Sequence, residues 1–207
     1  MKKTKVICAA CIAACIAVIA LSARIYKVNQ DVSLPPVKEW QIGEWVPMED
    51  NYFMEEYEIC NGYEIRVDGA EVLTCDEFLR KYNRDMETVL QDGALLPDMV
   101  YDISVTIRNT NRQETDCGLD LSNNALYASD FVLSINPELY EIANAENNIA
   151  TLMFRLQPMS ELEFHLPYGI AISAKSAYLK EDAVKERDMY LLLSLYPVQN
   201  QVVIHKR

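Results

Sequence analysis

The stretch Met99-Val-Tyr-Asp-Ile-Ser-Val-Thr-Ile-Arg-Asn109 decides the fold, because it alternates in the manner of a β-strand. Every second side chain is large and apolar: Tyr101, Ile103, Val105 and Ile107. The side chains between them are mostly polar: Val100, Asp102, Ser104, Thr106 and Arg108. Successive side chains of a strand point to opposite faces, so the apolar set should face a core and the other set solvent. We expect a half-buried strand over 99–109, ended by the turn Asn109-Thr-Asn111.

The same alternation recurs on both sides of this strand. Residues 63–73 form a second clear candidate, in which Gly69 predicts a β-bulge. Further candidate strands occupy residues 39–45, 126–135, 149–156, 162–174, 189–196 and 202–204. Seven or eight short strands separated by turns are typical of an antiparallel β-sandwich. The sequence therefore predicts a mainly β fold.

One helix interrupts this series. Thr74-Cys-Asp-Glu77 fits a capping box, in which the Thr74 hydroxyl and the Glu77 carboxylate satisfy backbone donors at a helix start. Apolar residues follow at helical spacing as far as Leu90, and Gly93 and Pro97 come next. We predict a single inserted helix over about 75–90. A second charged stretch, 178–187, is expected to be a helical or irregular connection.

The N-terminal segment has a different character. Val6–Ala23 is an apolar run of 18 residues without a charge, preceded by Met1-Lys-Lys-Thr-Lys5. Such a run is about 27 Å long as a helix, close to the thickness of a bilayer core. The sequence therefore predicts a basic cytoplasmic segment (1–5), a transmembrane or signal-anchor helix (6–23), an extended tether (24–37) and an extracytoplasmic domain (38–207).

Three interpretations of the anchor remain open, and we favour an uncleaved single-pass anchor in the cell membrane. Ile12-Ala-Ala-Cys15 resembles the lipobox of bacterial lipoproteins, which makes Cys15 a candidate lipidation site. Ala20-Leu-Ser-Ala23 could instead be the small-residue exit of a cleaved signal peptide. All three interpretations place the following domain outside the cytoplasm.

The charge of the chain restricts its partners. The 207 residues carry a net charge of −12. Without the four basic residues of the N-terminal segment, 15 basic residues face 31 acidic ones, which gives −16 for positions 26–207. An acidic surface repels nucleic acid and anionic lipid headgroups, so we expect no nucleic-acid partner.

Three cysteines lie outside the anchor, at positions 60, 75 and 117. An odd number excludes a complete disulfide framework. Cys60 and Cys75 could pair if Asp68-Gly69 formed a hairpin turn, but a continuous strand over Tyr63–Leu73 would span about 33 Å and keep them apart. We favour the continuous strand and free thiols.

Three segments carry a resemblance to a known group of proteins: Gly62-Tyr-Glu-Ile-Arg-Val67, Tyr101-Asp-Ile-Ser-Val-Thr-Ile-Arg-Asn-Thr110 and Tyr190–Pro197. Together with the anchored N-terminus, they resemble Gram-positive extracytoplasmic proteins of unknown function with an immunoglobulin-like domain, similar in shape to secreted immunoprotective antigens. The resemblance covers about residues 37–205 and implies an immunoglobulin-like antiparallel β-sandwich. It implies no catalytic residues, and fold alone does not define function.

Two groups of residues are candidates for binding. Aromatic side chains near or within an acidic stretch can form a contact surface for a protein partner: Trp40, Trp45, Tyr52, Phe53 and Tyr57. Three carboxylates in an expected loop could hold calcium: Glu114, Asp116 and Asp120. They lack the ordered spacing of a calcium loop, so a solvated turn is the favoured interpretation.

The sequence offers little for catalysis. His165 and His205 are the two histidines, with no zinc-ligand spacing around them, and the nucleophile-elbow and phosphate-loop motifs do not occur. We expect a non-enzymatic module without a cofactor. It would be tethered to the membrane of a bacterial envelope and would bind another envelope protein or component. The alternatives are a calcium or small-ligand binder and, less favoured, an envelope hydrolase that depends on His165.

Overall fold

The computed structural model describes residues 2–30, 34–91, 95–172, 184 and 187–204. The chain divides into two compact units, Met1–Leu34 and Pro35–Arg207. The first contains one helix, α1 (Lys2–Gln30). Among the residues described, no helix has both the length and the hydropathy needed to cross a membrane.

Helix α1 is longer than the predicted anchor, so the extended tether predicted over 24–37 is wrong for its first seven residues. No glycine or proline occurs between Ala23 and Gln30 to end the helix. The Gln30 side chain donates a hydrogen bond to the Tyr26 hydroxyl one turn earlier, at 2.7 Å. Residues 31–33 lie outside the described part of the chain.

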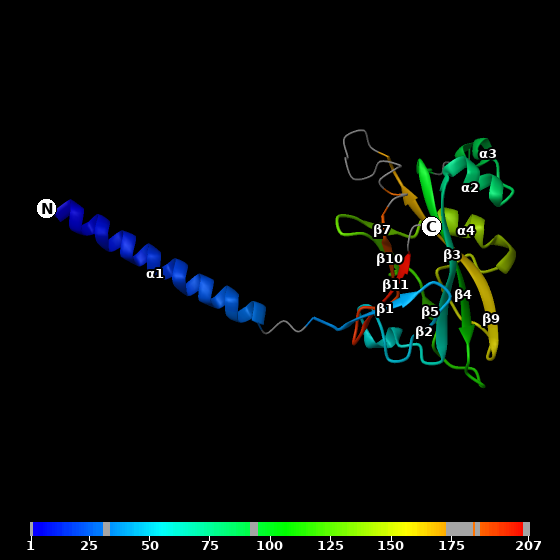
Figure 1. The fold of residues 1–207 in the computed structure, drawn as a ribbon, viewed down its shortest axis with the longest axis horizontal. Helices are drawn as coiled ribbons and strands as arrows, with labels where there is room; N and C mark the ends of the chain where they lie inside the picture. The colour runs from blue at the N-terminus through cyan, green and yellow to red at the C-terminus, as the bar shows by residue number, and fades with distance from the viewer. Residues whose placement is uncertain (1, 31–33, 92–94, 173–183, 185–186, 205–207) are drawn as a thin grey trace. The chain divides into compact units, whose positions relative to one another are not determined.

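The second unit is mainly β (Figure 1). Its described residues form eleven strands: β1 (Val37–Gln41), β2 (Trp45–Pro47), β3 (Tyr63–Thr74), β4 (Met99–Asn109), β5 (Leu119–Asp120), β6 (Ala125–Tyr127), β7 (Val132–Ser134), β8 (Met153–Phe154), β9 (Ser160–Ile170), β10 (Met189–Leu192) and β11 (Gln199–Ile204). They make a five-stranded sheet (β1-β11-β10-β6-β7), a four-stranded sheet (β2-β3-β4-β9) and a two-stranded sheet (β5-β8). All described pairings are antiparallel except that of β1 with β11.

One hydrophobic core joins the two larger sheets. Its members include Ile65, Ile103, Val105, Phe164 and Leu166 from the four-stranded sheet and Leu126, Leu191, Val202 and Ile204 from the five-stranded sheet. The apolar face predicted for residues 99–109 is buried in this core as expected. The predicted bulge in 63–73 is also present, because the pairing of β3 with β4 shifts between Val67 and Gly69.

The helical content differs from the prediction. The single helix expected over 75–90 is wrong, because it is divided into α2 (Cys75–Lys81) and α3 (Met86–Gln91). Asn83 adopts φ +54° between them, a left-handed conformation that ends α2. The capping box at Thr74 is confirmed, with both reciprocal hydrogen bonds in place. A further helix, α4 (Pro137–Ala143), and two 3-10 turns, η1 (Glu56–Glu58) and η2 (Ala145–Asn147), were not predicted.

Two other predictions are corrected by the structure. Residues 126–135 do not form one strand but the hairpin of β6 and β7. The free thiol favoured for Cys60 is wrong, because Cys60 forms a disulfide with Cys117. Cys75 is a free, buried thiol, as predicted. The connection predicted over 178–187 falls almost entirely outside the described residues.

Candidate functional site

A hollow of about 390 Å³ lies beside η1, and we call it the Tyr57 hollow. It is lined by Tyr57, Glu58, Asp116, Gly118, Asp120, Met153, Phe154 and Arg155. Three segments that are distant in the sequence therefore meet here. The structure brings together one predicted contact residue, Tyr57, and two of the predicted acidic residues, Asp116 and Asp120.

Covalent and backbone contacts hold these three segments together. The Cys60–Cys117 disulfide joins the loop after Tyr57 to the loop that contains Asp116. The next residue, Gly118, allows a close approach, because a Cβ there would lie 3.0 Å from the Phe154 carbonyl oxygen. Strand β5 then pairs with β8 and fixes the third segment. The walls of the hollow are thus set by the fold before any partner arrives.

The surface of the hollow combines exposed apolar groups with acidic ones. Tyr57 is 82% exposed and Met153 is 62% exposed, so two large apolar groups of this hollow face solvent. Asp116 is fully exposed and lies 4.0 Å from Arg155, the one basic residue of the lining. Glu58 accepts hydrogen bonds from backbone N–H groups, at 2.7 Å from that of Phe53. An exposed aromatic group with an acidic rim suits a partner that is both basic and apolar.

The other predicted contact residues do not belong to this hollow. Phe53 is 6% exposed, so the prediction that it offers a contact surface is wrong. Tyr52 exchanges backbone hydrogen bonds with Tyr196. Trp40 donates its indole N–H to Asn200 at 2.9 Å.

Trp45 is likewise engaged within the domain. The centroid of a ring in this half-buried residue lies 3.8 Å from the guanidinium of Arg108 and 4.5 Å from that of Arg66. This is cation–π packing on one face of the four-stranded sheet. Trp40 and Trp45 belong to different sheets. The two tryptophans therefore contribute to the packing of the domain and do not extend the Tyr57 hollow.

The predicted acidic site is only partly assembled. Glu114 is exposed and does not line the hollow, and Asp120 accepts hydrogen bonds from the Ser122 backbone and hydroxyl. Within the part of the chain that is described, no three His, Cys, Asp or Glu side chains converge as metal ligands do. Cys15, the candidate lipidation site, lies in α1 as a free thiol. His205 lies outside the described residues.

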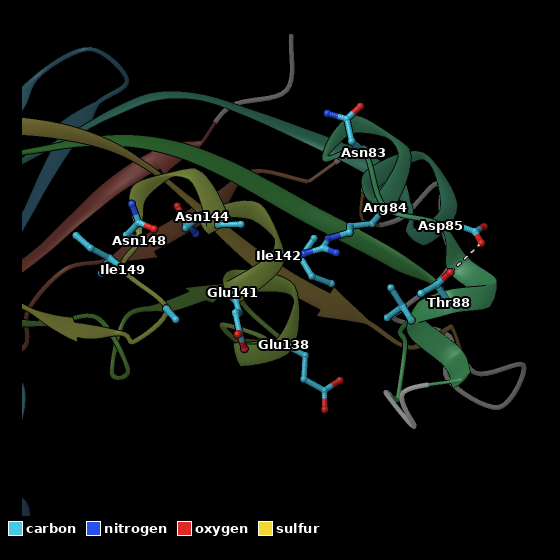
Figure 2. Close-up of a pocket in the computed structure, with 13 residues that line it drawn as sticks. Asn83, Arg84, Asp85, Thr88, Glu138, Glu141, Ile142, Asn144, Asn148 and Ile149 are labelled. Atoms are coloured by element: carbon cyan, nitrogen blue, oxygen red, sulfur yellow. Dashed lines mark hydrogen bonds between the residues drawn. The ribbon is translucent and has the colours of Figure 1, made fainter.

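A larger hollow of about 830 Å³ lies between two helical segments, and we call it the helical groove (Figure 2). One wall is the turn from α2 into α3, with Asn83, Arg84, Asp85, Thr88 and Val89. The other wall runs from α4 through η2 and beyond, with Glu138, Glu141, Ile142, Asn144, Ala145, Asn148, Ile149 and Ala150. Sequence reasoning missed this groove because it did not predict α4.

A buried ionic cluster lies near the base of the two groove walls. The Asp102 side chain is 1% exposed and accepts hydrogen bonds from the Lys81 ammonium and the Tyr82 hydroxyl, both at 2.8 Å. His165 Nδ1 lies 3.2 Å from the other Asp102 oxygen, and Lys81 also binds Glu71. The outer face of β4, predicted to face solvent, is therefore covered by α2 around Asp102.

The electrostatics of this cluster follow from its contacts. Burial by itself would raise the pKa of Asp102, but the hydrogen bonds and charges of His165 and Lys81 outweigh it and lower the pKa below its ordinary value. Burial raises the pKa of the Tyr82 hydroxyl, and the adjacent Asp102 carboxylate raises it further. Tyr82 is therefore a hydrogen-bond donor at neutral pH and Asp102 a charged acceptor.

His165 lies on β9 with its side chain directed away from the main core, yet this side chain is only 20% exposed. The Tyr82 ring packs against it edge to face, with centroids 5.2 Å apart. Its cross-strand neighbour is Ser104, whose hydroxyl donates to the Gly69 carbonyl at 3.4 Å. The sequence shows Asp102 and His165 at outward positions of two predicted strands. Knowledge of the pairing register between those strands would have placed the two side chains on the same face.

A family of related sequences covers most of the domain. Residues 37–200 match the family described as a domain of unknown function (DUF5028), and the chain belongs to that family. Neither the curated proteins nor the solved structures give a match.

Proposed function

We propose that this DUF5028 protein is a membrane-tethered, extracytoplasmic binding module that engages a basic and apolar surface of an envelope protein through the Tyr57 hollow. The observation that carries the proposal is the 82% exposed Tyr57 ring at the rim of a hollow whose walls are fixed by a disulfide. Tyrosine is enriched among the residues that dominate binding energy at interfaces. A rigid surface also loses little conformational entropy when a partner binds.

The charge of the hollow determines the kind of partner. Three acidic side chains, Glu58, Asp116 and Asp120, stand against the single cation of Arg155. A partner that brings lysine or arginine side chains beside an apolar anchor would neutralise this excess and cover Tyr57 and Met153. Attraction between opposite charges speeds association and weakens as salt rises.

The location of the module is part of the same proposal. Residues 6–23 are uncharged and apolar, follow three lysines, and lie within helix α1. These features support a membrane anchor with the domain outside. The Cys60–Cys117 disulfide supports an oxidising compartment, because such bonds are rare in the cytosol. The packing of the two larger sheets around one core is compatible with the immunoglobulin-like fold implied by the resemblance.

A photo-cross-linking experiment on intact cells tests the binding surface. A benzophenone amino acid would replace Tyr57 in one variant and Val132, which is 67% exposed on β7, in the control. We expect a discrete cross-linked product at position 57 and none at position 132. The product should diminish when Asp116→Asn and Asp120→Asn are added, and when salt rises from about 50 to 500 mM. A product that is equal at both positions, or insensitive to charge, would contradict the proposal.

A protease test addresses the location separately. External protease added to wall-stripped cells should remove the domain while leaving a cytosolic marker intact. Protection of the domain until the cells are lysed would place it inside and refute the tethering part of the proposal.

A further inference from the structure

The helical groove carries separated charges that do not neutralise one another. Arg84 lies on the α2–α3 wall, and Glu138 and Glu141 lie on the α4 wall (Figure 2). In the described part of the chain, none of these three side chains has a hydrogen-bond or ion-pair partner. Asp85 is different, because its carboxylate accepts a hydrogen bond from the Thr88 hydroxyl at 3.2 Å. The groove thus presents a free cation on one wall and two free carboxylates on the other.

The floor between these charges is partly apolar. Val89 is 9% exposed, and the half-buried Ile142 packs against the same small core. Ile149 is also half-buried and lines the groove beside Asn148 (Figure 2). A volume of about 830 Å³ lies within the range of about 300–1,000 Å³ typical of small-ligand sites. Apolar floors with a few polar groups at defined positions are the usual composition of such sites.

Both walls are held in place by hydrogen bonds to adjacent strands. On one side, Lys81 and Tyr82 at the end of α2 bind Asp102 of β4, and Arg84 donates its backbone N–H to the Leu79 carbonyl at 2.8 Å. On the other side, Asn144 accepts from the His165 N–H and donates to the His165 carbonyl, both at 2.9 Å. Because β4 and β9 are neighbours in one sheet, the distance between the walls is determined by the fold.

From this arrangement we propose that the groove binds a small zwitterion, an amino acid or short peptide with free ends. The ligand carboxylate contacts the Arg84 guanidinium, and the ligand ammonium contacts Glu138 and Glu141. Guanidinium and carboxylate groups form paired, charge-assisted hydrogen bonds, which give both orientation and affinity. The apolar floor accommodates the ligand side chains. This site is separate from the Tyr57 hollow and does not depend on the function proposed for it.

Calorimetry on the full chain in detergent, at about 50 mM salt, tests this site with defined probes. Trialanine with free ends is the first probe, N-acetyl-trialanine amide the second and alanine the third. We expect heat from trialanine and none from the blocked peptide. Binding of alanine with equal affinity would identify free amino acids as the ligand class, and binding of trialanine alone would identify peptides.

Variants then assign the contacts. Arg84→Gln and the pair Glu138→Gln and Glu141→Gln should each weaken trialanine about 5- to 10-fold. Arg80→Gln on α2 and Glu87→Gln on α3 are the control variants, because they change the same residue types at positions outside the lining of the groove. Thermal unfolding would verify that each variant is folded. Equal binding of the blocked peptide, no heat at about 20 mM trialanine, or equal losses in the control variants would overturn the proposal.

Discussion

Replacing Asp102 by alanine should lower the stability of the domain more than any exposed acidic substitution. Asp102 is the acceptor at the centre of the buried cluster, where it binds Lys81, Tyr82 and His165. The substitution leaves the Tyr82 hydroxyl and the Lys81 ammonium without their buried partner. It therefore removes a favourable interaction and also creates a desolvation penalty.

The expected loss follows from burial and from the number of partners. Removing one member of a buried ion pair costs about 3–5 kcal/mol, and a hydrogen bond to a charged group contributes about 1.5–3 kcal/mol. The Lys81 side chain is 34% exposed and keeps its contact with Glu71, so its share must be reduced for solvent screening. We expect a loss of about 3 kcal/mol, which for a domain of this size lowers Tm by about 6–12 °C.

Urea unfolding at pH 7, followed by circular dichroism, measures this loss. The matched control is Asp76→Ala, because Asp76 also pairs with a basic residue of α2, Arg80, at 2.7 Å but is 51% exposed. Exposed pairs contribute about 1 kcal/mol or less, so the control should change little. If Asp102→Ala and Asp76→Ala differed by less than about 1 kcal/mol, the reasoning from burial would be refuted.

The same cluster determines how stability depends on pH. The ionisable groups around Asp102 are Glu71 on β3, Lys81 at the end of α2, Tyr82 directly after it, and Glu163 and His165 on β9. Because the folded pKa of Asp102 is lowered, its contribution is complete above the unfolded pKa of about 3.9 and is lost as pH falls through the folded pKa. The Asp102 contribution should therefore be present at pH 7, and the difference between the wild type and Asp102→Ala should shrink as pH falls below about 4. A difference that did not shrink there would contradict this sign.

Two further predictions concern single covalent or capping contacts. The double variant Cys60→Ala and Cys117→Ala removes a disulfide that spans a sequence separation of 57, so the free energy of unfolding should fall by up to about 4 kcal/mol. Reductant should destabilise only the wild type, and equal sensitivity of the double variant would show that another thiol is responsible. Thr74→Ala removes the hydroxyl that accepts from the Glu77 N–H and should lower the stability measured by thermal unfolding by about 1 kcal/mol. Thr74→Ser should restore most of this stability, and failure of the serine variant to do so would exclude capping as the cause of the loss.

Local signals in the sequence predicted the elements that depend on local contacts. The alternation in 99–109 identified β4, and Gly69 identified the bulge in β3, because both follow from the two-residue period of a strand. The capping box at Thr74 was also identifiable, since its partners lie three residues apart. The exposed position of Tyr57 was compatible with the prediction of a contact surface, although its neighbours in the hollow were not foreseen.

Two errors in the predicted helices came from helix-start signals that were present in the sequence but were not used. Asn136-Pro137 is a start signal for α4, because Asn136 accepts from the Leu139 N–H at 3.1 Å and proline is favoured in the first turn. Likewise, Asp85 directly precedes α3 and follows the left-handed residue Asn83, and aspartate is a residue type favoured at helix starts. The apolar periodicity continued across this break and concealed it.

The remaining errors involve contacts between residues distant in the sequence. No local pattern tells that Cys60 pairs with Cys117 and not with Cys75, because that choice depends on how the loops meet. Pairing across a separation of 57 residues is a property of the tertiary fold. The Tyr57 hollow is unpredictable for the same reason, since its three segments meet only after the sheets have formed.

Asp102 shows most clearly what alternation can and cannot predict. The two-residue period correctly assigned Asp102 and Val100 to the face opposite the core, but it did not reveal that α2 covers that face. A charged group can be covered only if partners replace its water, and Lys81, Tyr82 and His165 do so. The partners on α2 must then occupy fixed positions. The contacts of Asp102 with Lys81 and Tyr82 therefore hold the C-terminal end of α2 against β4, next to the turn that forms one wall of the helical groove.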